Sequence, residues 1–294
     1  MSNALSRAMI VGAGGMLAAA LRRSLVRRGV EPILCDRARC DLTDKDAVLR
    51  LIDDERPSVV VNAAAYTAVD KAEAEEAQAH QVNGDAPGHL AAACAKVGAK
   101  LVHFSTDFVF DGNGACPYPV DAPVEPISAY GRSKLAGEQA IANSKLDDYL
   151  ILRTAWLYGP WVGRPFPKLM VDLARAGTPL KVVDDQRGAP TMTVDLAEAA
   201  LDLIAGDHRG MFHVTNGGET TWYSFAVAAL DAFAVNDAAI EPTTTAAYPA
   251  GKTGIAPRPP YSVLDLSKTE RALGRPMRPW RRALLDYRDL CAAQ

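Results

Sequence analysis

The first half of the chain alternates short apolar runs with longer stretches of helical spacing. The apolar runs are rich in Val, Ile and Leu and lie at 8–12, 32–36, 58–62, 100–105 and 149–156. Runs of this kind predict buried strands. Their alternation with helices predicts parallel strands covered on both faces. We expect an α/β fold built on a Rossmann-type, doubly wound parallel sheet.

The expected helices carry recognisable end signals. Gly29 closes the first helix, and Ser128 has the polar side chain that caps a helix start. Thr43, followed three residues later by Asp46, resembles a capping box. The predicted helices of this half are 16–29, 44–55, 83–98 and 130–143.

The second half has a different composition. Pro and Gly are dense at 158–167, 177–190 and 242–260, and the clearest helices are 197–204, 224–233 and 279–291. We expect residues 1–155, with parts of 190–215, to form the first domain. Residues 156–294 are then mainly a smaller C-terminal α/β lobe over the carboxyl ends of the strands. Open α/β sheets bind their ligands at those ends.

Composition narrows the class of protein. The 294 residues are 49% hydrophobic and 23% charged, which is ordinary for a globular protein. A formal net charge of −3 does not indicate binding to nucleic acid or to an anionic membrane. No apolar run approaches the roughly 18 residues of a membrane span, and no secretory signal is visible. The scattered cysteines form no CxxC pair, which predicts reduced thiols in a cytoplasmic protein without a zinc site.

The first predicted strand ends in a glycine-rich turn. Residues 12–18 read GAGGMLA, a GxxGxxA pattern in which Ala18 replaces the third glycine. Glycines there allow a tight turn and let backbone amides approach a pyrophosphate at the positive helix end. A plain strand-to-helix turn is the alternative. The context favours a dinucleotide site.

That context is the end of the second strand. Asp36 stands about 20 residues further on, where a carboxylate accepts hydrogen bonds from ribose hydroxyls. This favours NADH. Arg37 and Arg39 follow directly and could hold a 2′-phosphate, so NADPH stays open. Asp41 and Leu42 could flank the adenine.

Tyr130 and Lys134 lie one turn apart on a predicted helix. Reduction of a ketone needs a proton for the oxygen, which a phenol can supply. A neighbouring ammonium and the positive helix end should lower the pKa of Tyr130. A second YxxxK string, Tyr248 to Lys252, lies in a Pro/Gly loop and is assigned no role.

Thr106 and Asp107 follow the fourth strand directly. A hydroxyl there can donate to a carbonyl oxygen and hold it beside Tyr130. The alternative is a hydroxyl that only satisfies its own turn.

The motifs together resemble a known group of enzymes. They are GAGGML near the start, NAAAYTAVDKAE at 62–73, STDFVFDG at 105–112, YGRSKLAGE at 130–138, RTAWLYG at 153–159, DQRGAPT at 185–191 and YSVLDLSK at 261–268. The chain resembles the extended short-chain dehydrogenase/reductases and, within them, the dTDP-4-dehydrorhamnose reductase family.

The resemblance implies NADH- or NADPH-dependent reduction of the C4 ketone of dTDP-4-dehydro-6-deoxy-L-mannose to dTDP-L-rhamnose. Tyr130 would be the proton donor, with Lys134 on the nicotinamide ribose and Thr106 as the third catalytic residue. Substrate contacts would be Thr106, Asp107, Trp156 and Arg187. Cofactor contacts would be Gly12, Gly14, Gly15, Met16, Leu17, Asp36, Asp41, Leu42, Ala64, Ala65, Tyr66, Thr67, Tyr130 and Lys134.

Several of these roles have structural alternatives. Trp156 can also be a core aromatic that closes the fifth strand, and Asn62 and Asp70 can be structural caps. Some members of the family pair through a magnesium ion with a carboxylate ligand on the first helix. Ala20 stands near that place and cannot ligate a metal, so we expect no metal and a monomer or weak homodimer.

Four other readings compete with this one. A sugar-nucleotide dehydratase typically has Asp-Glu after the threonine, and here Phe108 follows Thr106-Asp107. An epimerase would hold its dinucleotide tightly as a trapped catalyst. A dinucleotide-binding regulatory subunit, such as that of methionine adenosyltransferase, has no need for Tyr130 and Lys134. The same reaction on another 4-keto-6-deoxy sugar, as in deoxytalose or streptose branches, also stays open.

Overall fold

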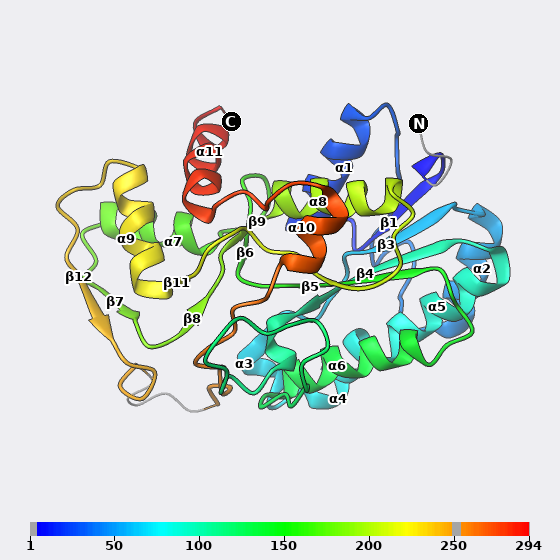
Figure 1. The fold of residues 1–294 in the computed structure, drawn as a ribbon, viewed down its shortest axis with the longest axis horizontal. Coiled ribbons are helices and arrows are strands. Elements are labelled where there is room, and N and C mark those ends of the chain that lie inside the picture. The colour runs from blue at the N-terminus through cyan, green and yellow to red at the C-terminus, as the bar shows by residue number, and fades with distance from the viewer. Residues whose placement is uncertain (1–4, 249–253, 294) are drawn as a thin grey trace.

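The computed structural model describes residues 5–248 and 254–293, and its centre is a six-stranded parallel sheet (Figure 1). The order is β10-β5-β4-β3-β1-β2. All the predicted strands are present, and β10 was missed because it is short and lies in the Pro/Gly-rich half. The strands are β1 (Ala8–Val11), β2 (Ile33–Cys35), β3 (Val59–Asn62), β4 (Lys100–Thr106), β5 (Tyr149–Thr154) and β10 (Gly210–His213).

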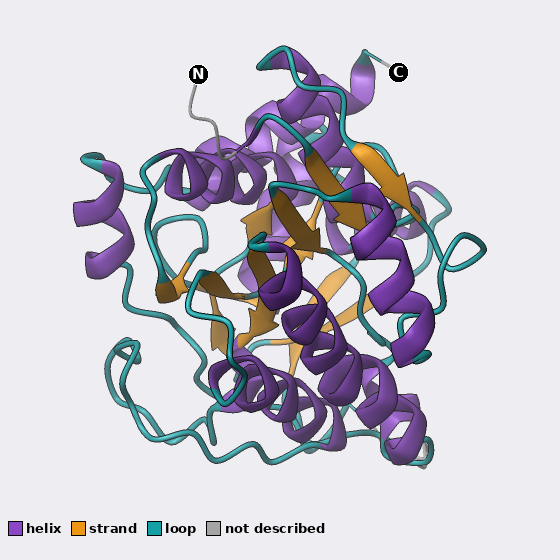
Figure 2. Cartoon of the chain, turned by 90° about the vertical axis from the view of Figure 1, so that its right-hand side faces the viewer, coloured by secondary structure: helices purple, strands orange, loops and turns teal. Residues whose placement is uncertain are grey.

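Helices cover both faces of this sheet, which confirms the predicted fold class (Figures 1 and 2). One face carries α1 (Met16–Arg27), α8 (Thr193–Ala205) and α10 (Ser267–Leu273). The other carries α2 (Lys45–Glu55), α5 (Ala86–Val97) and α6 (Ala129–Ala142). Beside α6 lie α3 (Val69–Ala72), α4 (Glu76–His80) and a π-helical turn, Gln81–Asp85.

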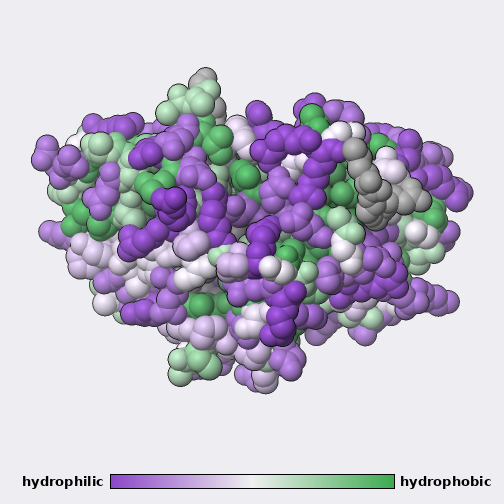
Figure 3. Space-filling model, turned by 45° about the horizontal axis from the view of Figure 1, so that its top comes forward, coloured by the Kyte–Doolittle hydropathy of each residue, from purple (hydrophilic) through white to green (hydrophobic). Residues whose placement is uncertain are grey.

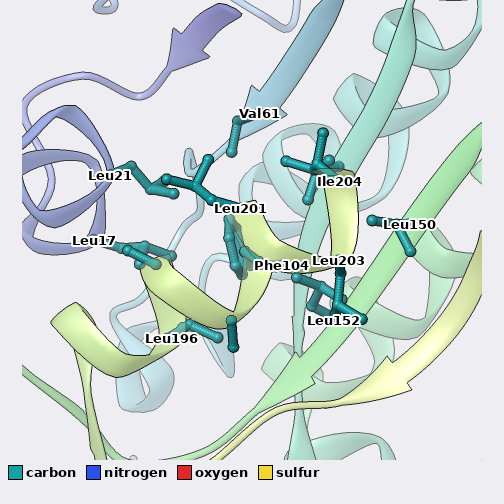
Figure 4. Close-up of a cluster of buried hydrophobic side chains, with 14 of the residues drawn as sticks. Leu17, Leu21, Val61, Phe104, Leu150, Leu152, Leu196, Leu201, Leu203 and Ile204 are labelled. Carbon is teal, nitrogen blue, oxygen red and sulfur yellow. The ribbon is translucent and has the colours of Figure 1, made fainter. Parts of the chain in front are cut away.

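Helix α8 supplies much of the main core although it comes late in the chain. Its leucines and Ile204 pack against α1 and against side chains of β3, β4 and β5 (Figure 4). Full burial of a side chain of this size stabilises the fold by about 1.5–3 kcal/mol. The labelled members are Leu17, Leu21, Val61, Phe104, Leu150, Leu152, Leu196, Leu201, Leu203 and Ile204.

The predicted cap of α2 is wrong by one residue. Asp44, not Thr43, is the N-cap, and its carboxylate accepts from the backbone N–H of Ala47. The Thr43 hydroxyl donates instead to Asp41, because both belong to the turn after β2. Ser128 caps α6 as predicted and accepts from the N–H of Gly131.

The C-terminal part adds a second layer of helices beside the sheet, at the left of Figure 1. Its aromatic core surrounds Tyr158, Phe225 and Trp280. The helices are α7 (Phe166–Arg175), α9 (Trp222–Ala232) and α11 (Trp280–Ala292). The paired short strands are β7 (Leu180–Val183) with β12 (Ile240–Thr243), β6 (Leu157–Tyr158) with β9 (Thr191–Met192), and β8 (Arg187–Gly188) with β11 (Thr220–Thr221).

Parts of the second half return to the first sheet. Helix α8 and strand β10 fall within the 190–215 segment that was expected there. Leu266 and Leu273, at either end of α10, also pack on the core of the first sheet, although the sequence placed them in the smaller lobe. The lobe is therefore interwoven with the first domain.

The surface and the cysteines of the structure agree with what the composition predicts. Apolar residues are interspersed among polar ones on the face shown in Figure 3. Among the described residues, none of the helices has the length and hydrophobicity that a bilayer crossing requires. The cysteines are free thiols, as predicted.

Two glycines let α6 lie unusually close to its neighbours. A Cβ at Gly131 would stand 2.3 Å from the carbonyl oxygen of Phe108, and one at Gly137 would stand 2.1 Å from that of Asn83. Backbone carbonyls cannot move aside as a flexible side chain can. Close packing here sets the depth at which α6 presents its polar residues to β4.

We predict that Gly137→Ala destabilises the protein by about 2 kcal/mol or more, because overpacking outweighs the better helix propensity of Ala. Urea unfolding measures this. Gly14→Ala is the control, since a methyl group there meets nothing within 4 Å. Equal stability of the two variants would contradict the packing argument.

Candidate active site

The glycine turn after β1 is shaped for a ligand. Gly12 has φ +78°, and a Cβ there would lie 2.5 Å from the backbone nitrogen of Ala64. Gly14 faces open space, and Gly15 is the N-cap of α1 with no side chain to occupy the helix end. The N-terminal amides of α1 can therefore approach an anion, as a dinucleotide pyrophosphate requires.

A pocket of about 550 Å³ opens at this turn. Five predicted cofactor contacts do not line it: Met16 lies beside Gly159, Leu17 is in the core, Thr67 is exposed, and Tyr130 and Lys134 lie on α6. The predicted residues that line the pocket are Gly12, Gly14, Gly15, Asp36, Asp41, Leu42, Ala64, Ala65 and Tyr66. The sequence missed Gln78 and Val82, which reach the pocket from the α4 region and carry no motif.

The charged side chains after β2 differ in how strongly neighbouring groups hold them. The Asp36 carboxylate lines the pocket and accepts from the N–H of Arg39 at 3.0 Å. The Arg39 guanidinium is bound to Glu55 and to the Leu34 carbonyl. The Arg37 side chain is 79% exposed beside the pocket and forms only a long ion pair, 3.4 Å, with Asp41. Of the two arginines, Arg37 is the one whose guanidinium is held more loosely and can turn to a phosphate.

Helix α6 presents Tyr130, Lys134 and Glu138 at one-turn spacing. Lys134 and Glu138 are buried against β4, while the Tyr130 ring is partly exposed. The spacing of this row matches the helical period, so all three side chains share one face. The predicted pair therefore lies on a single helix face at the carboxyl end of β4.

The structure reverses the expected shift of Tyr130. Burial of the hydroxyl raises its pKa to about 12, and the interaction with the Thr106 hydroxyl only partly opposes this rise. Lys134 does not act on it as expected, because its Nζ donates to the Phe104 carbonyl at 2.6 Å. Tyr130 is thus a phenol at neutral pH, which suits a proton donor.

Lys134 is enclosed by the sheet. Its Nζ lies 3.3 Å from Nε2 of His103. Burial lowers the pKa of Lys134 to about 8, although the charge of Glu138 opposes the shift. Tyr130 and Lys134 therefore have pKa values moved in opposite directions by the same burial.

Asp107 is a buried carboxylate next to Thr106. Burial raises its pKa to about 6, and nearby hydroxyls of Ser262 and Thr106 offset part of that. Oδ1 accepts from the Thr106 hydroxyl at 3.0 Å. Oδ2 has no hydrogen-bond partner in the part of the chain that the structure describes. An unsatisfied buried carboxylate is costly and typical of a functional site.

A buried ion pair holds α6 against the sheet below this site. Arg153 of β5 donates to both oxygens of Glu138, at 2.9 and 2.7 Å, and Ser105 of β4 donates to one of them. Because the partners are nine-tenths buried or more, removing one would leave an uncompensated charge.

A second pocket, of about 710 Å³, lies between α7, β7 and the 254–258 segment. Lys181 and Arg258 give it two cations, and Trp222 gives it an aromatic wall. Trp156 stacks on Trp222 with ring centroids 3.7 Å apart. Trp156 also has φ +47°, a strained conformation for a bulky residue. The sequence singled out Trp156 and missed Trp222, which lies in no motif.

Tyr130 and Tyr66 pack against the same alanine cluster, which includes Ala72 of α3. Tyr66 lines the first pocket, and Asp70, also on α3, lines the second. Helix α3 therefore connects the surroundings of Tyr130, which lines neither pocket, to both of them.

Other predicted side chains lie elsewhere. Arg187 is exposed and pairs with Glu219 at 2.8 Å, while its neighbour Gln186 lines the second pocket. Asn62 is buried, and Asp70 pairs with Arg258 at 2.6 Å. Tyr248 is exposed, and Lys252 lies outside the described residues.

The Rossmann sheet, the glycine turn and the buried phenol define an oxidoreductase that uses a nicotinamide dinucleotide. Comparison with known proteins makes this specific. The family model of the RmlD substrate binding domain matches residues 6–291. The chain belongs to this dTDP-4-dehydrorhamnose reductase family.

Individual relatives extend over nearly the whole chain. A dTDP-4-dehydrorhamnose reductase of Streptomyces griseus is 43% identical over 97% of this chain and 94% of that protein. A dTDP-4-keto-6-deoxy-D-glucose reductase of Streptomyces niveus is 40% identical over 95% of each. The crystal structure of a dTDP-4-dehydrorhamnose reductase from Bacillus anthracis in complex with NADP has a TM-score of 0.88 at 34% identity, covering 96% of this chain and 97% of that one.

We predict that Asp107→Asn stabilises the protein in a pH-dependent way. The pKa of Asp107 in the folded protein is about 6, above the ordinary value of 3.8. Between these two pH values the folded state therefore binds more protons than the unfolded state. Protonated Asp107 therefore makes its full contribution to stability below the pKa of the unfolded state. This contribution is lost as the pH rises through about 6.

Urea unfolding should show the variant more stable than the parent by about 2 kcal/mol near pH 8, with the gain absent near pH 3.5. Asp121→Asn, at an exposed carboxylate, is the control and should change little. A gain that is the same at both pH values would show that Asp107 is not a strained buried acid.

Proposed function

We propose that this protein reduces the C4 ketone of dTDP-4-dehydro-6-deoxy-L-mannose to dTDP-L-rhamnose with NADPH or NADH. The observation that carries the proposal is Tyr130, whose enclosed hydroxyl interacts with Thr106 at the carboxyl end of β4. One pocket has the glycine turn of a dinucleotide site, and the other has cations and aromatic rings suited to a nucleotide sugar.

The dinucleotide would lie over Gly12, Gly14 and Gly15 with its ribose at Asp36, and when bound it supplies the hydride. Tyr130 donates its proton to the carbonyl oxygen as that oxygen gains negative charge. The Thr106 hydroxyl holds the same oxygen in place. Because Tyr130 is a phenol at neutral pH, the donor is already in its reactive form.

The second pocket would hold the dTDP moiety. Arg258 and Lys181 offer positive charge to the diphosphate. The stacked Trp156 and Trp222 offer a flat apolar surface for a sugar ring or a base. Asp70 holds Arg258 in place, so its role in this proposal is to orient that guanidinium.

A second candidate is the same reaction on another nucleotide-linked 4-keto-6-deoxy sugar. The Streptomyces niveus relative, whose name specifies a different keto sugar at 40% identity, favours keeping it. A dehydratase is disfavoured by Phe108, whose ring packs edge-on against Tyr130 and offers no acid. A regulatory role is disfavoured by the intact Tyr130–Thr106 pair.

We infer a cytoplasmic monomer or weak homodimer without a bridging metal. Ala20 lies on the buried face of α1, so a side chain there faces the core rather than a second subunit. Within the described ranges, no group of three or more His, Cys, Asp and Glu side chains could hold a metal ion.

We predict that Tyr130→Phe lowers kcat by at least about 10²-fold, since the proton donor is lost. Affinity for NADPH should be nearly unchanged, because the ring and its packing remain. Stopped-flow turnover and fluorescence titration of NADPH measure the two effects. Tyr149→Phe, at the amino end of β5, is the control. Turnover at the parent's rate would refute the assignment of Tyr130.

We predict that Asp36 and Arg37 select between the two cofactors. Asp36→Ala should weaken the binding of NADH about tenfold more than the binding of NADPH, since it removes the acceptor for a free 2′-hydroxyl. Arg37→Ala should weaken NADPH more, since it removes the available cation. Dissociation constants from fluorescence titration give the ratio.

Arg39→Ala is the matched control for cofactor choice. Its guanidinium is bound to Glu55 and Leu34, so the ratio of NADH to NADPH affinity should stay as in the parent. If Asp36→Ala weakens the binding of NADH and NADPH equally, Asp36 does not bind the ribose hydroxyl.

A further inference from the structure

The loops that follow β7 and β12 bring two polar side chains together at the second pocket. The two strands are parallel neighbours, so their carboxyl ends lie side by side (Figure 1). Gln186 follows β7, Thr245 follows β12, and both line the pocket. Gln186 is 7% exposed, and its Nε2 lies 3.0 Å from Oγ1 of Thr245. The chemistry at Tyr130 makes no use of this pair.

The hydroxyl hydrogen of Thr245 is already committed to a carboxylate. Oγ1 of Thr245 donates to Oδ1 of Asp185 at 2.7 Å. The backbone N–H of Thr245 donates to both oxygens of the same carboxylate, at 2.8 and 2.9 Å. A carboxylate only accepts, and a hydroxyl has a single hydrogen to donate. Toward Gln186, the Thr245 hydroxyl can therefore only accept.

This fixes the orientation of the Gln186 amide. The NH₂ group must face Thr245, because an amide oxygen there would oppose one acceptor with another. The amide oxygen Oε1 accepts no hydrogen bond from the described residues, and it is not one of their fully enclosed polar atoms without a partner. Gln186 thus presents an open acceptor to the pocket that it lines.

The pocket has an apolar wall on the side of the lobe. The wall consists of side chains from one hydrophobic cluster: Phe166, Met170, Val182 and Trp222. Of the two cations, Arg258 is held at 2.6 Å by Asp70 of α3, in the first domain. A planar base favours an apolar and aromatic wall, and a diphosphate favours a guanidinium. A nucleotide sugar bound in this way has its base beside β7 and Gln186.

Nucleotide bases differ in what they offer to such an acceptor. Thymine and uracil carry a hydrogen on N3, whereas N3 of cytosine is itself an acceptor. We propose that Gln186 is a specificity-determining residue, whose amide oxygen accepts the N3–H of a thymine or uracil base and thereby rejects cytosine. Thr245 and Asp185 are positioning residues, because they act only by keeping this amide from turning over.

The inference deepens the proposed function and rests on the placement of the dTDP moiety in the second pocket. It concerns the base, which lies at the opposite end of the nucleotide from the reacting ketone. Nucleoside diphosphates without a sugar therefore test it without turnover and without the cofactor.

The test is the affinity of the full chain for dTDP, dUDP and dCDP, measured by isothermal titration calorimetry. The ratio of dUDP to dCDP affinity isolates the base, because the two share the deoxyribose and the diphosphate. We expect the parent to bind dTDP and dUDP at least about tenfold more tightly than dCDP, since two opposed acceptors leave the Gln186 oxygen unpaired.

Two variants separate the acceptor from its support. Gln186→Met keeps the length of the side chain and removes the acceptor, so the ratio should fall toward one through weaker binding of dUDP. Thr245→Val removes the oxygen that holds the amide, which can then turn its NH₂ group to N3 of cytosine. We expect Thr245→Val to bind dCDP about threefold more tightly than the parent and dUDP more weakly. A role in packing alone would weaken both nucleotides alike.

Gln139→Met, at an exposed position of α6, is the matched control and should keep the parent's ratio. Equal binding of dUDP and dCDP by the parent would overturn the proposal, and this comparison stands even if a variant fails to fold. A parent's ratio retained in both folded test variants would also overturn it. A parent that shows the expected ratio but reduces no keto sugar would refute only the proposed function, and one that binds none of the three nucleotides would refute both.

Discussion

The packing of α6 against β4 is the constraint on which the site depends. Gly131 and Gly137 let α6 lie close to the turn after β4 and to the π-helical turn Gln81–Asp85, and the Arg153–Glu138 pair ties α6 to the sheet. The approach encloses the Tyr130 hydroxyl and the Lys134 nitrogen. Because both groups lose water, burial moves their pKa values toward the neutral forms. Tyr130 therefore keeps its proton at neutral pH, which suits reduction of a carbonyl.

This arrangement costs stability where it serves chemistry. Asp107 keeps one oxygen without a partner among the described residues, and Trp156 holds a left-handed backbone. Such features persist only where the surrounding fold over-determines them. Around Trp156 that fold is the stacked ring of Trp222 and the close approach of Gly188, where a Cβ would stand 2.6 Å from the indole.

The sequence predicted the elements whose signals are local. Hydrophobic runs placed the strands up to β5, Ser128 marked the start of α6, and the glycine turn indicated the dinucleotide pocket. The pKa of Tyr130 was predicted in the wrong direction, since burial and the turn of Lys134 toward Phe104 are tertiary effects. Trp222 and Arg258 were missed for a similar reason: they reach the second pocket from distant segments without a motif.

The central claim is that hydride and proton meet at one carbonyl beside Tyr130. The most direct measurement is turnover of dTDP-4-dehydro-6-deoxy-L-mannose with NADPH that carries two deuterium atoms at C4 of the nicotinamide, with the product examined by proton NMR. The account predicts dTDP-L-rhamnose carrying deuterium at C4, with one NADPH oxidised for each product formed. Absence of deuterium at C4, or conversion of the sugar without net oxidation of NADPH, would contradict it.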